Sequence, residues 1–362
     1  MARVLVGLSG GVDSSAAAAL LLEQGHDVVG AYMKNWINEE GIPGECPWEE
    51  DLEDAAAVAD QLGIEFRVVD LIDQYRERIV DYLLEGYRSG VTPNPDVLCN
   101  REMKFGVFLD YALSQGFEKV GTGHYARRRQ SPEGKAVILR GADPNKDQSY
   151  FLSLMTQRQA QHALFPVGEM LKPKVREVAQ RFGLPTATKK DSQGICFIGN
   201  IKMSEFLRHY VPDSPGEIVD LQGRVLGRHD GLHLYTLGQR KGHGVASPRE
   251  GMAYVVVAKD AARNRLVVGW DERDTEGLYA TECTVVSLSA VGEEIVPVGG
   301  RRTCEAQPRY RSQAEVVVLE SGENCVKVQF ERPQRALTPG QICAFYNGGE
   351  LLGGGVFEQV IS

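Results

Sequence analysis

The sequence has no run of the ~18 to 20 apolar residues that a helix needs to cross a bilayer. We also expect no signal peptide, because the first residues run straight into a predicted strand. The seven cysteines are an odd number, and no two of them are separated by two residues. This pattern argues against a disulfide framework and against a zinc ribbon, so we assign no metal-ligating residues. We therefore expect a cytoplasmic protein that contacts no membrane.

The sequence has fewer basic than acidic residues: 40 lysines and arginines and 49 aspartates and glutamates, which give a net charge of −9. One segment causes most of the imbalance, because residues 38–54 hold eight acidic residues and no basic one, and removing these eight charges leaves −1. Cations cluster elsewhere, either as solvated faces or as a surface for nucleic acid. These clusters are Arg127–Arg129, Lys172–Arg176, Lys189-Lys190, Arg240-Lys241, Arg301-Arg302 and Arg309–Arg311.

The most informative stretch is Ser9–Ser15, with the sequence Ser-Gly-Gly-Val-Asp-Ser-Ser. The apolar run Val4–Leu8 before it predicts a strand buried on both faces, and residues 16–24 after it favour a helix. Gly10 and Gly11 let the backbone approach a ligand, and the free N–H groups of a helix N-terminus favour an anion such as phosphate. The loop lacks the lysine of a Walker A motif. It resembles the signature of the PP-loop ATP pyrophosphatases, which release pyrophosphate and leave AMP on the substrate.

Strands and helices alternate through the first half of the chain. Residues 28–33 and 66–71 read as strands, and 52–62 and 75–87 as helices, which predicts an α/β fold with a parallel sheet. Two closely spaced prolines predict a loop of fixed shape over Thr92–Asn100. After about Ser204, short strands and frequent turns predict a small barrel or sandwich. We expect a PP-loop catalytic domain over 1–203, a small central domain over 204–272 and a β-barrel-like domain over 273–362.

Two cysteines stand apart from the other five. Cys99 and Cys196 lie in loops rich in glycine, proline and asparagine, whereas Cys46 lies among carboxylates that would blunt it as a nucleophile. The remaining four fall in the strand-rich C-terminal part and are expected to be small buried hydrophobes.

Taken together, these motifs resemble the bacterial-type tRNA-specific 2-thiouridylases, over essentially the whole chain. The segments that carry the resemblance are Met33–Trp36, Asn94–Asn100, Gly121–Tyr125, Lys146–Phe151, Gly194–Gly199 and Tyr235–Gly242. The family places sulfur at position 2 of the wobble uridine of certain tRNAs. The resemblance implies use of Mg-ATP to adenylate the uridine oxygen, and a persulfide sulfur donor such as a cysteine desulfurase or a sulfur-carrier protein.

Site residues follow from the same resemblance. Cys196 is implied as the persulfide carrier, Cys99 as its partner nucleophile and Asp96 as a general acid or base. The ATP site is implied to comprise Gly7, Leu8, Ser9, Gly10, Gly11, Val12, Asp13, Ser14, Met33 and Gly123. The tRNA contacts are implied to be Asn94, Pro95, Asp96, His124, Lys146, Asp147, Gln148, Arg309, Tyr310 and Gln341.

Several alternatives stay open at this point. Asp96, Cys99 and Cys196 could instead ligate an iron–sulfur cluster with one open iron site, or the two thiols could be unrelated. His124 could instead be a structural histidine with its hydrogen bonds satisfied, and Lys146 and Arg309 could be plain surface charges. The chain as a whole could be an ATP-dependent amide-forming ligase, although it has no evident ammonia source, or a nucleotide-sensing or RNA-binding module without chemistry.

Overall fold

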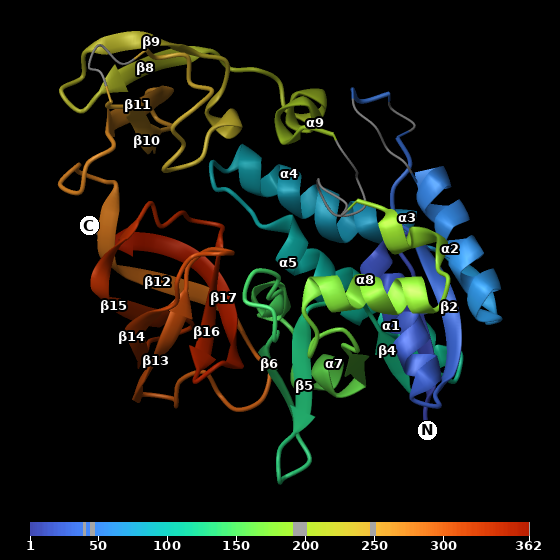
Figure 1. Ribbon diagram of the computed structural model, residues 1–362. Coiled ribbons are helices and arrows are strands. Elements are labelled where there is room, and N and C mark those ends of the chain that lie inside the picture. The colour runs from blue at the N-terminus through green and yellow to red at the C-terminus, as the bar shows by residue number, and fades with distance from the viewer. Residues whose placement is uncertain (39–40, 44–47, 191–200, 247–250, 362) are drawn as a thin grey trace.

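A computed structural model describes residues 1–38, 41–43, 48–190, 201–246 and 251–361 (Figure 1). Its N-terminal part is built on a parallel sheet in the order β3-β2-β1-β4-β7. The strands are β1 (Arg3–Gly7), β2 (Asp27–Lys34), β3 (Phe66–Asp70), β4 (Lys119–Gly121) and β7 (Ala163–Leu164). The predicted α/β fold is therefore confirmed.

Helices cover both faces of this sheet, as the burial of β1 requires. Val4 and Val6 pack into one core with α1 (Val12–Glu23), α2 (Trp48–Leu62) and α8 (Lys172–Arg181), whereas Leu5 points into the other core. The second core is covered by two long helical runs, each with a π-helical segment inside it. The first joins α3 (Ile72–Tyr75), η1 (Arg76–Val80) and α4 (Asp81–Arg88), and the second joins α5 (Pro95–Cys99), η2 (Asn100–Val107) and α6 (Phe108–Ser114).

The predicted loop over Thr92–Asn100 is wrong from its fourth residue onward. Asn94 caps α5 by accepting a hydrogen bond from the Val97 N–H at 3.2 Å, and Pro95 occupies the first helical position. Proline is well tolerated there, because the first N–H groups of a helix have no partner within the helix. The two prolines therefore fix the start of a helix.

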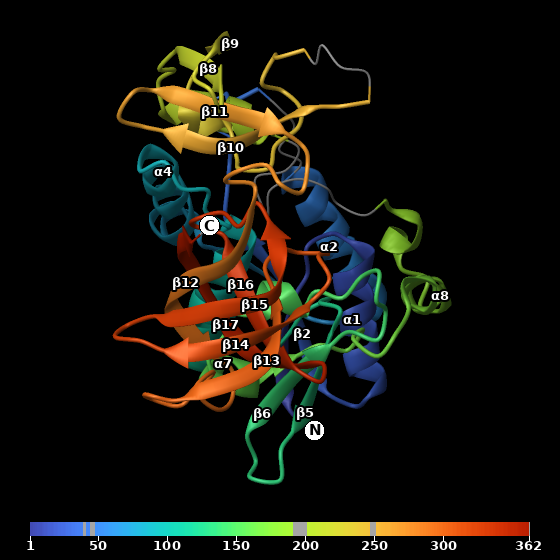
Figure 2. The same ribbon diagram turned by 90° about the vertical axis from the view of Figure 1, so that its left-hand side faces the viewer.

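A small central sheet follows α9 (Met203–Tyr210). It has the order β10-β11-β8-β9, with β11 and β8 parallel and the other pairs antiparallel. Its strands are β8 (Gly216–Asp220), β9 (Val225–His229), β10 (Tyr254–Asp260) and β11 (Arg265–Trp270). The pairs β8–β9 and β10–β11 are antiparallel hairpins. Figure 2 shows this sheet stacked above the C-terminal strands.

The C-terminal strands close into a barrel, because β12, the first strand in the sheet order, also pairs with β17, the sixth. Around the barrel the order is β12 (Tyr279–Ala290), β15 (Val326–Arg335), β14 (Glu315–Ser321), β13 (Arg301–Gln307), β16 (Ile342–Asn347) and β17 (Glu350–Ile361). Val285, Val317 and Phe345 are among the fully buried side chains of its core. The alternative of a sandwich is therefore excluded.

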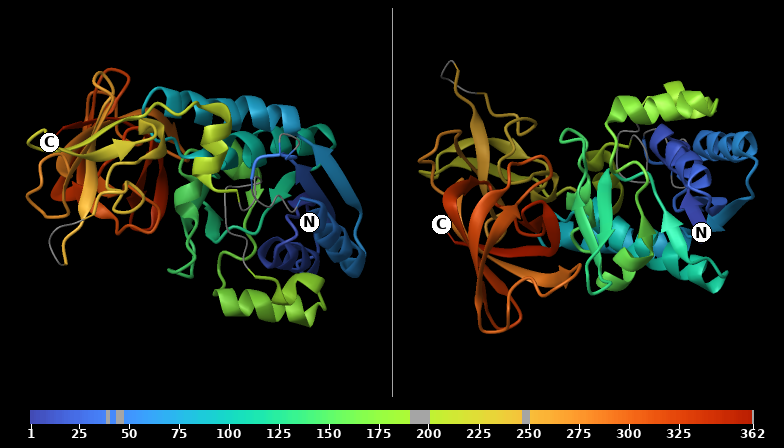
Figure 3. Two further views of the ribbon diagram at one scale, coloured as in Figure 1. Left: turned by 90° about the horizontal axis from the view of Figure 1, so that it is seen from above. Right: turned by 60° about the horizontal axis from the view of Figure 1, so that its bottom comes forward.

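One hairpin from the N-terminal half joins the barrel sheet. The strands β5 (Ala126–Gln130) and β6 (Ala136–Arg140) pair with each other, and Ile138 and Leu139 of β6 pair with Leu351 and Glu350 of β17. The sequence did not predict this hairpin, which attaches the barrel to the α/β part (Figure 3). The domain boundaries themselves stay a prediction.

Short helical segments complete the described chain: η3 (Ser149–Leu152), α7 (Gln157–His162), η4 (Pro185–Thr188) and η5 (Leu232–Leu234). None of the helices in the described ranges is both long enough and apolar enough to cross a membrane.

Candidate nucleotide and base-binding site

The loop between β1 and α1 is shaped by close backbone contacts at its first glycine. Gly10 has φ of +70°, and a Cβ built there would lie 2.5 Å from the Asp51 carbonyl oxygen of α2. Only glycine accepts both conditions. The Ser14 hydroxyl accepts a hydrogen bond from the Ser9 N–H at 3.1 Å and donates one to the Gly11 carbonyl at 3.0 Å, which fixes the turn.

This loop fits a phosphate group. No side chain within the described ranges caps α1, so the N–H groups of its first turn remain available to an anion. Gly123 closes the opposite side, since a Cβ there would lie 2.6 Å from the Asp13 carbonyl carbon. Met33 is 4% exposed, and its Cε lies 3.2 Å from the point where Gly7 would carry a Cβ, so it forms the floor at the end of β1.

Asp13 lies in the first turn of α1 and is held by two residues that the sequence analysis did not assign to the site. Lys172 Nζ donates to both carboxylate oxygens at 2.8 and 2.9 Å, and the Tyr125 hydroxyl donates at 2.7 Å. Lys172 begins α8, where its N–H donates to the buried carboxylate of Asp143 at 3.0 Å. A lysine that the loop itself lacks is thus supplied from another helix.

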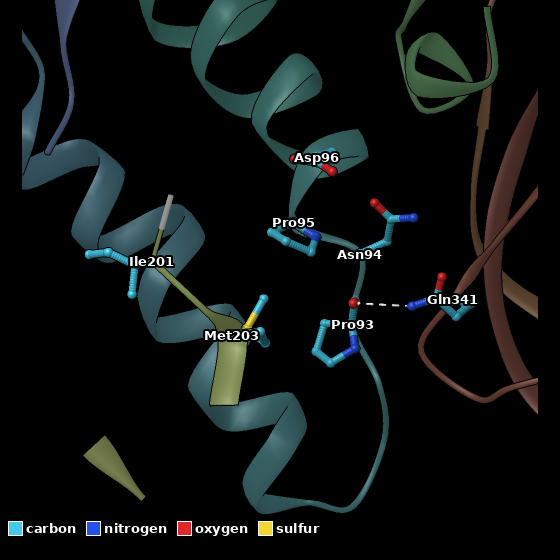
Figure 4. Close-up of a pocket in the computed structure, with 7 residues that line it drawn as sticks. All are labelled: Pro93, Asn94, Pro95, Asp96, Ile201, Met203 and Gln341. Atoms are coloured by element: carbon cyan, nitrogen blue, oxygen red, sulfur yellow. Dashed lines mark hydrogen bonds between the residues drawn. The ribbon is translucent and has the colours of Figure 1, made fainter. Parts of the chain in front are cut away.

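A pocket of about 380 Å³ lies at the start of α5 (Figure 4). The Gln341 amide, from the turn between β15 and β16, donates to the carbonyls of Thr92 at 2.8 Å and Pro93 at 3.2 Å. The Thr92 N–H donates in return to the Pro339 carbonyl at 3.0 Å. Three separate segments therefore form the pocket, which is lined by Pro93, Asn94, Pro95, Asp96, Ile201, Met203 and Gln341.

The predicted catalytic residues divide between described and undescribed parts of the chain. Asp96 lines the pocket, and Cys99 follows three residues later on the same helix, so the two side chains lie on adjacent positions of one face. Cys99 is completely buried. Cys196 lies in residues 191–200, outside the described residues, as does Cys46.

The described residues that flank 191–200 lie at two different places, one beside the phosphate loop and the other at the pocket. Lys189 Nζ forms ion pairs with Asp51 at 2.9 Å and with Asp54, both on α2 beside the phosphate loop. On the other side, Ile201 lines the pocket together with Asp96. The chain thus leaves from beside the nucleotide loop and returns at the pocket.

The predicted tRNA contacts between residues 124 and 148 lie between the phosphate loop and the barrel. Asp147 accepts hydrogen bonds from the Gly141 N–H at 2.8 Å and from Ser149, and it pairs with Arg140 at 3.0 Å. Gln148 exchanges hydrogen bonds with the Tyr125 backbone in both directions. The side chains of Asp147 and Gln148 therefore organise this segment internally, while Lys146 is half-buried beside them.

His124 is 8% exposed and packs between Phe105 and Phe165. Its Nδ1 lies 2.8 Å from the Thr122 hydroxyl. Burial, assisted by the charge of Lys104, holds the pKa of His124 well below its ordinary value of 6.5, so the ring is neutral. A tRNA contact by this residue stays a prediction, and its surroundings also fit the structural role.

The barrel contributes the remaining predicted tRNA contacts. Arg309 donates to the Ala336 carbonyl and reaches the Thr338 hydroxyl at 3.5 Å. Tyr310 packs against Phe151, with ring centroids 4.3 Å apart, and Arg311 lies over its ring. Arg309 therefore lies against the turn that leads to Gln341, and Tyr310 lies against η3.

Among the described residues there is no group of three or more histidine, cysteine, aspartate or glutamate side chains arranged to hold a metal ion. Because Cys196 is not among them, this observation does not decide between a persulfide site and an iron–sulfur site. Among the predicted site residues, Asp13 is the carboxylate that lies at the phosphate loop, in the first turn of α1.

Three family models match consecutive parts of the chain. They are described as the tRNA methyl transferase HUP domain over residues 2–200, the tRNA methyl transferase PRC-barrel domain over 204–270 and the aminomethyltransferase β-barrel domain over 280–357.

Curated relatives that carry the name tRNA-specific 2-thiouridylase MnmA match the chain from end to end. The protein of Akkermansia muciniphila is 67% identical over 99% of both chains. That of Streptococcus sanguinis is 47% identical over 99% of this chain and 95% of its own. That of Pseudomonas entomophila is 46% identical over 98% and 94%.

Solved structures match only part of the chain. A 4-thiouridine synthetase in complex with RNA and bound ATP is 17% identical, with a TM-score of 0.38, over 58% of this chain and 50% of that one. The NMN synthetase of Francisella tularensis is 18% identical, with a TM-score of 0.32, over 53% and 66%. Likeness at this level does not bear on function.

Proposed function

This chain belongs to the tRNA-specific 2-thiouridylase family, and from that premise we propose how its residues divide the reaction into two steps. Membership makes it a tRNA sulfurtransferase that uses ATP, which displaces the alternatives of an amide-forming ligase and of a module without chemistry. The proposed substrate atom is the 2-oxygen of the wobble uridine. The first step activates that oxygen, and the second replaces it with sulfur.

The phosphate loop serves the activation step. The uridine oxygen attacks the α-phosphorus of ATP, the bond to the β-phosphate breaks, and pyrophosphate leaves while AMP stays on the oxygen. The N–H groups at the start of α1 and the turn at Gly10 and Gly11 hold the phosphates. A magnesium ion, when bound, neutralises phosphate charge, and Asp13 is the carboxylate that would hold it. Lys172 places a second positive charge beside Asp13.

The pocket serves the sulfur-transfer step. A base in a folded anticodon loop has to be splayed out before its atoms can react, and a pocket that receives a base performs this task. Asn94 and Pro95 contact the base in this proposal, while Asp96 moves a proton to or from it. The observation that carries the proposal is the position of Asp96, which lines the pocket together with Ile201 and lies three residues before Cys99 on the same helix.

Two cysteines then transfer the sulfur to the base. A persulfide on Cys196 attacks carbon 2 of the activated uridine, and AMP leaves with the original oxygen. The Cys99 thiolate attacks the Cys196 sulfur, which frees the thiolated base and leaves a Cys99–Cys196 disulfide for an external thiol to reduce. Since Cys99 is completely buried in this structure, neighbouring side chains have to shift before the two sulfurs can meet.

Nucleoside mass spectrometry tests the proposal. Wobble-uridine tRNA is incubated with the protein, Mg-ATP and a desulfurase that generates persulfide, with ATP omitted in a parallel reaction. Sulfur at the wobble uridine that depends on ATP supports the proposal. The same spectra separate a thio group from a methyl group, which matters because the family models carry a methyl transferase description. Unmodified tRNA in the complete reaction would contradict the proposal.

A further inference from the structure

Three arginines converge where the central sheet meets the barrel, close to the pocket. Arg240 comes from the loop after η5, Arg335 ends β15, and Arg309 follows β13. Arg335 pairs with Asp271 at 3.0 Å, and Arg240 pairs with the other oxygen of the same carboxylate at 3.2 Å. We call this set of Arg240, Arg309, Arg335 and Asp271 the arginine seam. Figure 2 shows the two sheets that it joins.

A glycine lets the central loop lie directly on the barrel. Gly238 has φ of +81°, and a Cβ built there would lie 2.7 Å from the Ala336 Cβ. The same point is 3.1 Å from Arg335 Nη1 and 3.9 Å from Arg309 Nη1, so the two guanidinium groups lie side by side beneath the loop. Gly238 and Arg240 both belong to the motif Tyr235–Gly242, to which neither reaction step assigns a role.

The seam carries more positive than negative charge. Asp271 is shared by two arginines, and Arg309 forms no ion pair with a carboxylate in the described part of the chain. Burial and the nearby charge of Arg335 lower the pKa of Arg309, as expected for cations that repel one another. Arg240 is 58% exposed, and Lys241 beside it is also exposed.

Other carboxylates do not neutralise this charge within contact distance. The exposed acids on the loop after β11 are Glu272, Asp274 and Glu276. Within the described ranges none of them forms an ion pair with a seam arginine. A polyanion therefore has cationic groups to meet there.

The seam connects to the pocket through one turn of the barrel. Arg309 reaches the Thr338 hydroxyl at 3.5 Å, and Thr338 begins the turn that ends at Gln341. Gln341 holds the Thr92 and Pro93 carbonyls at the pocket. An anion bound at the seam is thus linked by protein contacts to the segment that carries Asn94 and Asp96.

We propose that the arginine seam binds a backbone phosphate of the tRNA, with Arg240 and Arg335 as contacts beyond Arg309. The inference rests on the proposed function, in which a tRNA base enters the adjacent pocket. Guanidinium groups bind phosphate oxygens through two parallel hydrogen bonds, and backbone contacts of this kind fix the position of a nucleic acid without reading its sequence. Asp271 pairs with Arg240 and Arg335 and therefore competes with the phosphate for both guanidinium groups.

The competing explanation is that the seam is only a structural brace between the central sheet and the barrel. The two roles differ in what they predict for Asp271. If the seam is only a brace, the Asp271 and Arg335 variants lose the same ion pair, and tRNA binding changes equally in both. For a phosphate site, loss of an arginine weakens tRNA binding, whereas loss of Asp271 removes a competing anion and does not weaken it.

Equilibrium binding of wobble-uridine tRNA, without ATP and over a series of NaCl concentrations, tests the proposal. We expect Arg240→Gln and Arg335→Gln each to raise Kd roughly 5- to 10-fold at low salt and to reduce the slope of log K against log [salt] by about 0.7 to 1. Asp271→Asn should bind as tightly as the parent or more tightly. The matched control is Arg263→Gln, an exposed arginine of the central sheet paired with Asp260, which should leave Kd and slope unchanged.

Two results would overturn the inference. One is unchanged binding by both arginine variants, and the other is a loss for Asp271→Asn as large as that for Arg335→Gln. Arg240 is a surface residue, so its variant tests the proposal even if Arg335→Gln does not fold. If the parent protein binds no tRNA, the proposed function fails with the inference. If the parent thiolates tRNA and both arginine variants bind normally, only the inference fails.

Discussion

The phosphate loop and the pocket differ in how their residues come together. The loop lies within residues 7–14 and is shaped by its own glycines and serines. The pocket draws on residues 93–96, on Ile201 and Met203, and on Gln341 of the barrel. A site built from consecutive residues leaves a motif in the sequence, whereas an assembled site exists only after folding. The proposed chemistry divides along the same line, so each region can be disabled while the other still works.

The largest expected effect comes from Cys196→Ser, which should disable the sulfur-transfer step alone. A serine carries no persulfide, so thiolation should fall by at least about 10³-fold, while pyrophosphate release with tRNA continues. In one single-turnover reaction, nucleoside mass spectrometry measures thiolation and a pyrophosphate assay measures the activation step. Cys325→Ser, at a partly exposed barrel cysteine, is the control and should leave both intact.

Full thiolation by Cys196→Ser would remove that residue from the mechanism. The iron–sulfur alternative is tested by anaerobic iron and sulfide assays on the purified protein. Stoichiometric iron that disappears in Cys196→Ser would replace the persulfide scheme with a cluster.

The second effect comes from Asp13→Asn, which should impair the activation step at the phosphate loop. The change removes the carboxylate that holds Lys172 and that would hold magnesium, so pyrophosphate release and thiolation should fall together by roughly 10²-fold. Binding of tRNA without ATP should stay unchanged. The control is Asp27→Asn, an exposed aspartate paired with Arg3 at the opposite end of the sheet. A loss of thiolation with normal pyrophosphate release would place Asp13 outside the activation step.

The loop also shows where prediction from sequence stops. The strand, the turn and the helix around Ser9–Ser15 follow from glycine conformation and apolar patterning, which are local properties. Tyr125 and Lys172, which hold Asp13, lie more than a hundred residues away in the chain. The missing Walker A lysine indicates that a cation is needed from elsewhere, but only the packing of α8 against α1 identifies Lys172.

The third effect comes from Gln341→Ala, which loosens the pocket without touching the loop. The variant loses the hydrogen bonds to the Thr92 and Pro93 carbonyls, so Kd for tRNA should rise about 3- to 10-fold while ATP binding is unchanged. Gln329→Ala, an exposed glutamine on β15, is the matched control. Equal weakening of ATP and tRNA binding would indicate a general loss of structure instead.

Sequence patterns predicted the types of fold around the pocket but not the pocket itself. Alternation in Val326–Phe330 and the turn at Thr338–Gln341 indicate strands and a reversal, and the barrel contains both. The same patterns cannot show that this turn packs on Thr92, since such contacts depend on side chains far apart in the chain. The prolines at 93 and 95 predict a loop from the sequence alone, but Asn94 caps a helix there and Pro95 occupies its first position, where proline is tolerated.

The smallest expected effect on the reaction concerns His124, which follows Gly123 beside the phosphate loop. Burial holds its pKa well below 6.5, so the folded protein keeps this ring neutral while the unfolded chain protonates it as the pH falls below about 6.5. The unfolded state then binds more protons, and the free energy of unfolding should fall with decreasing pH, by at most about 1.4 kcal/mol per pH unit. His124→Gln should remove this part of the acid sensitivity, measured as the unfolding midpoint between pH 7 and 5.

His162→Gln, at a surface histidine, is the control for that series. The same His124 variant also tests the predicted tRNA contact, because a residue that only packs between Phe105 and Phe165 should alter stability and leave Kd for tRNA at pH 7 unchanged. A weaker Kd with unaltered acid sensitivity would assign His124 to the RNA surface. His124, next to the phosphate loop, would then also take part in tRNA binding. The loop and the pocket would be less separate in function than their different construction suggests.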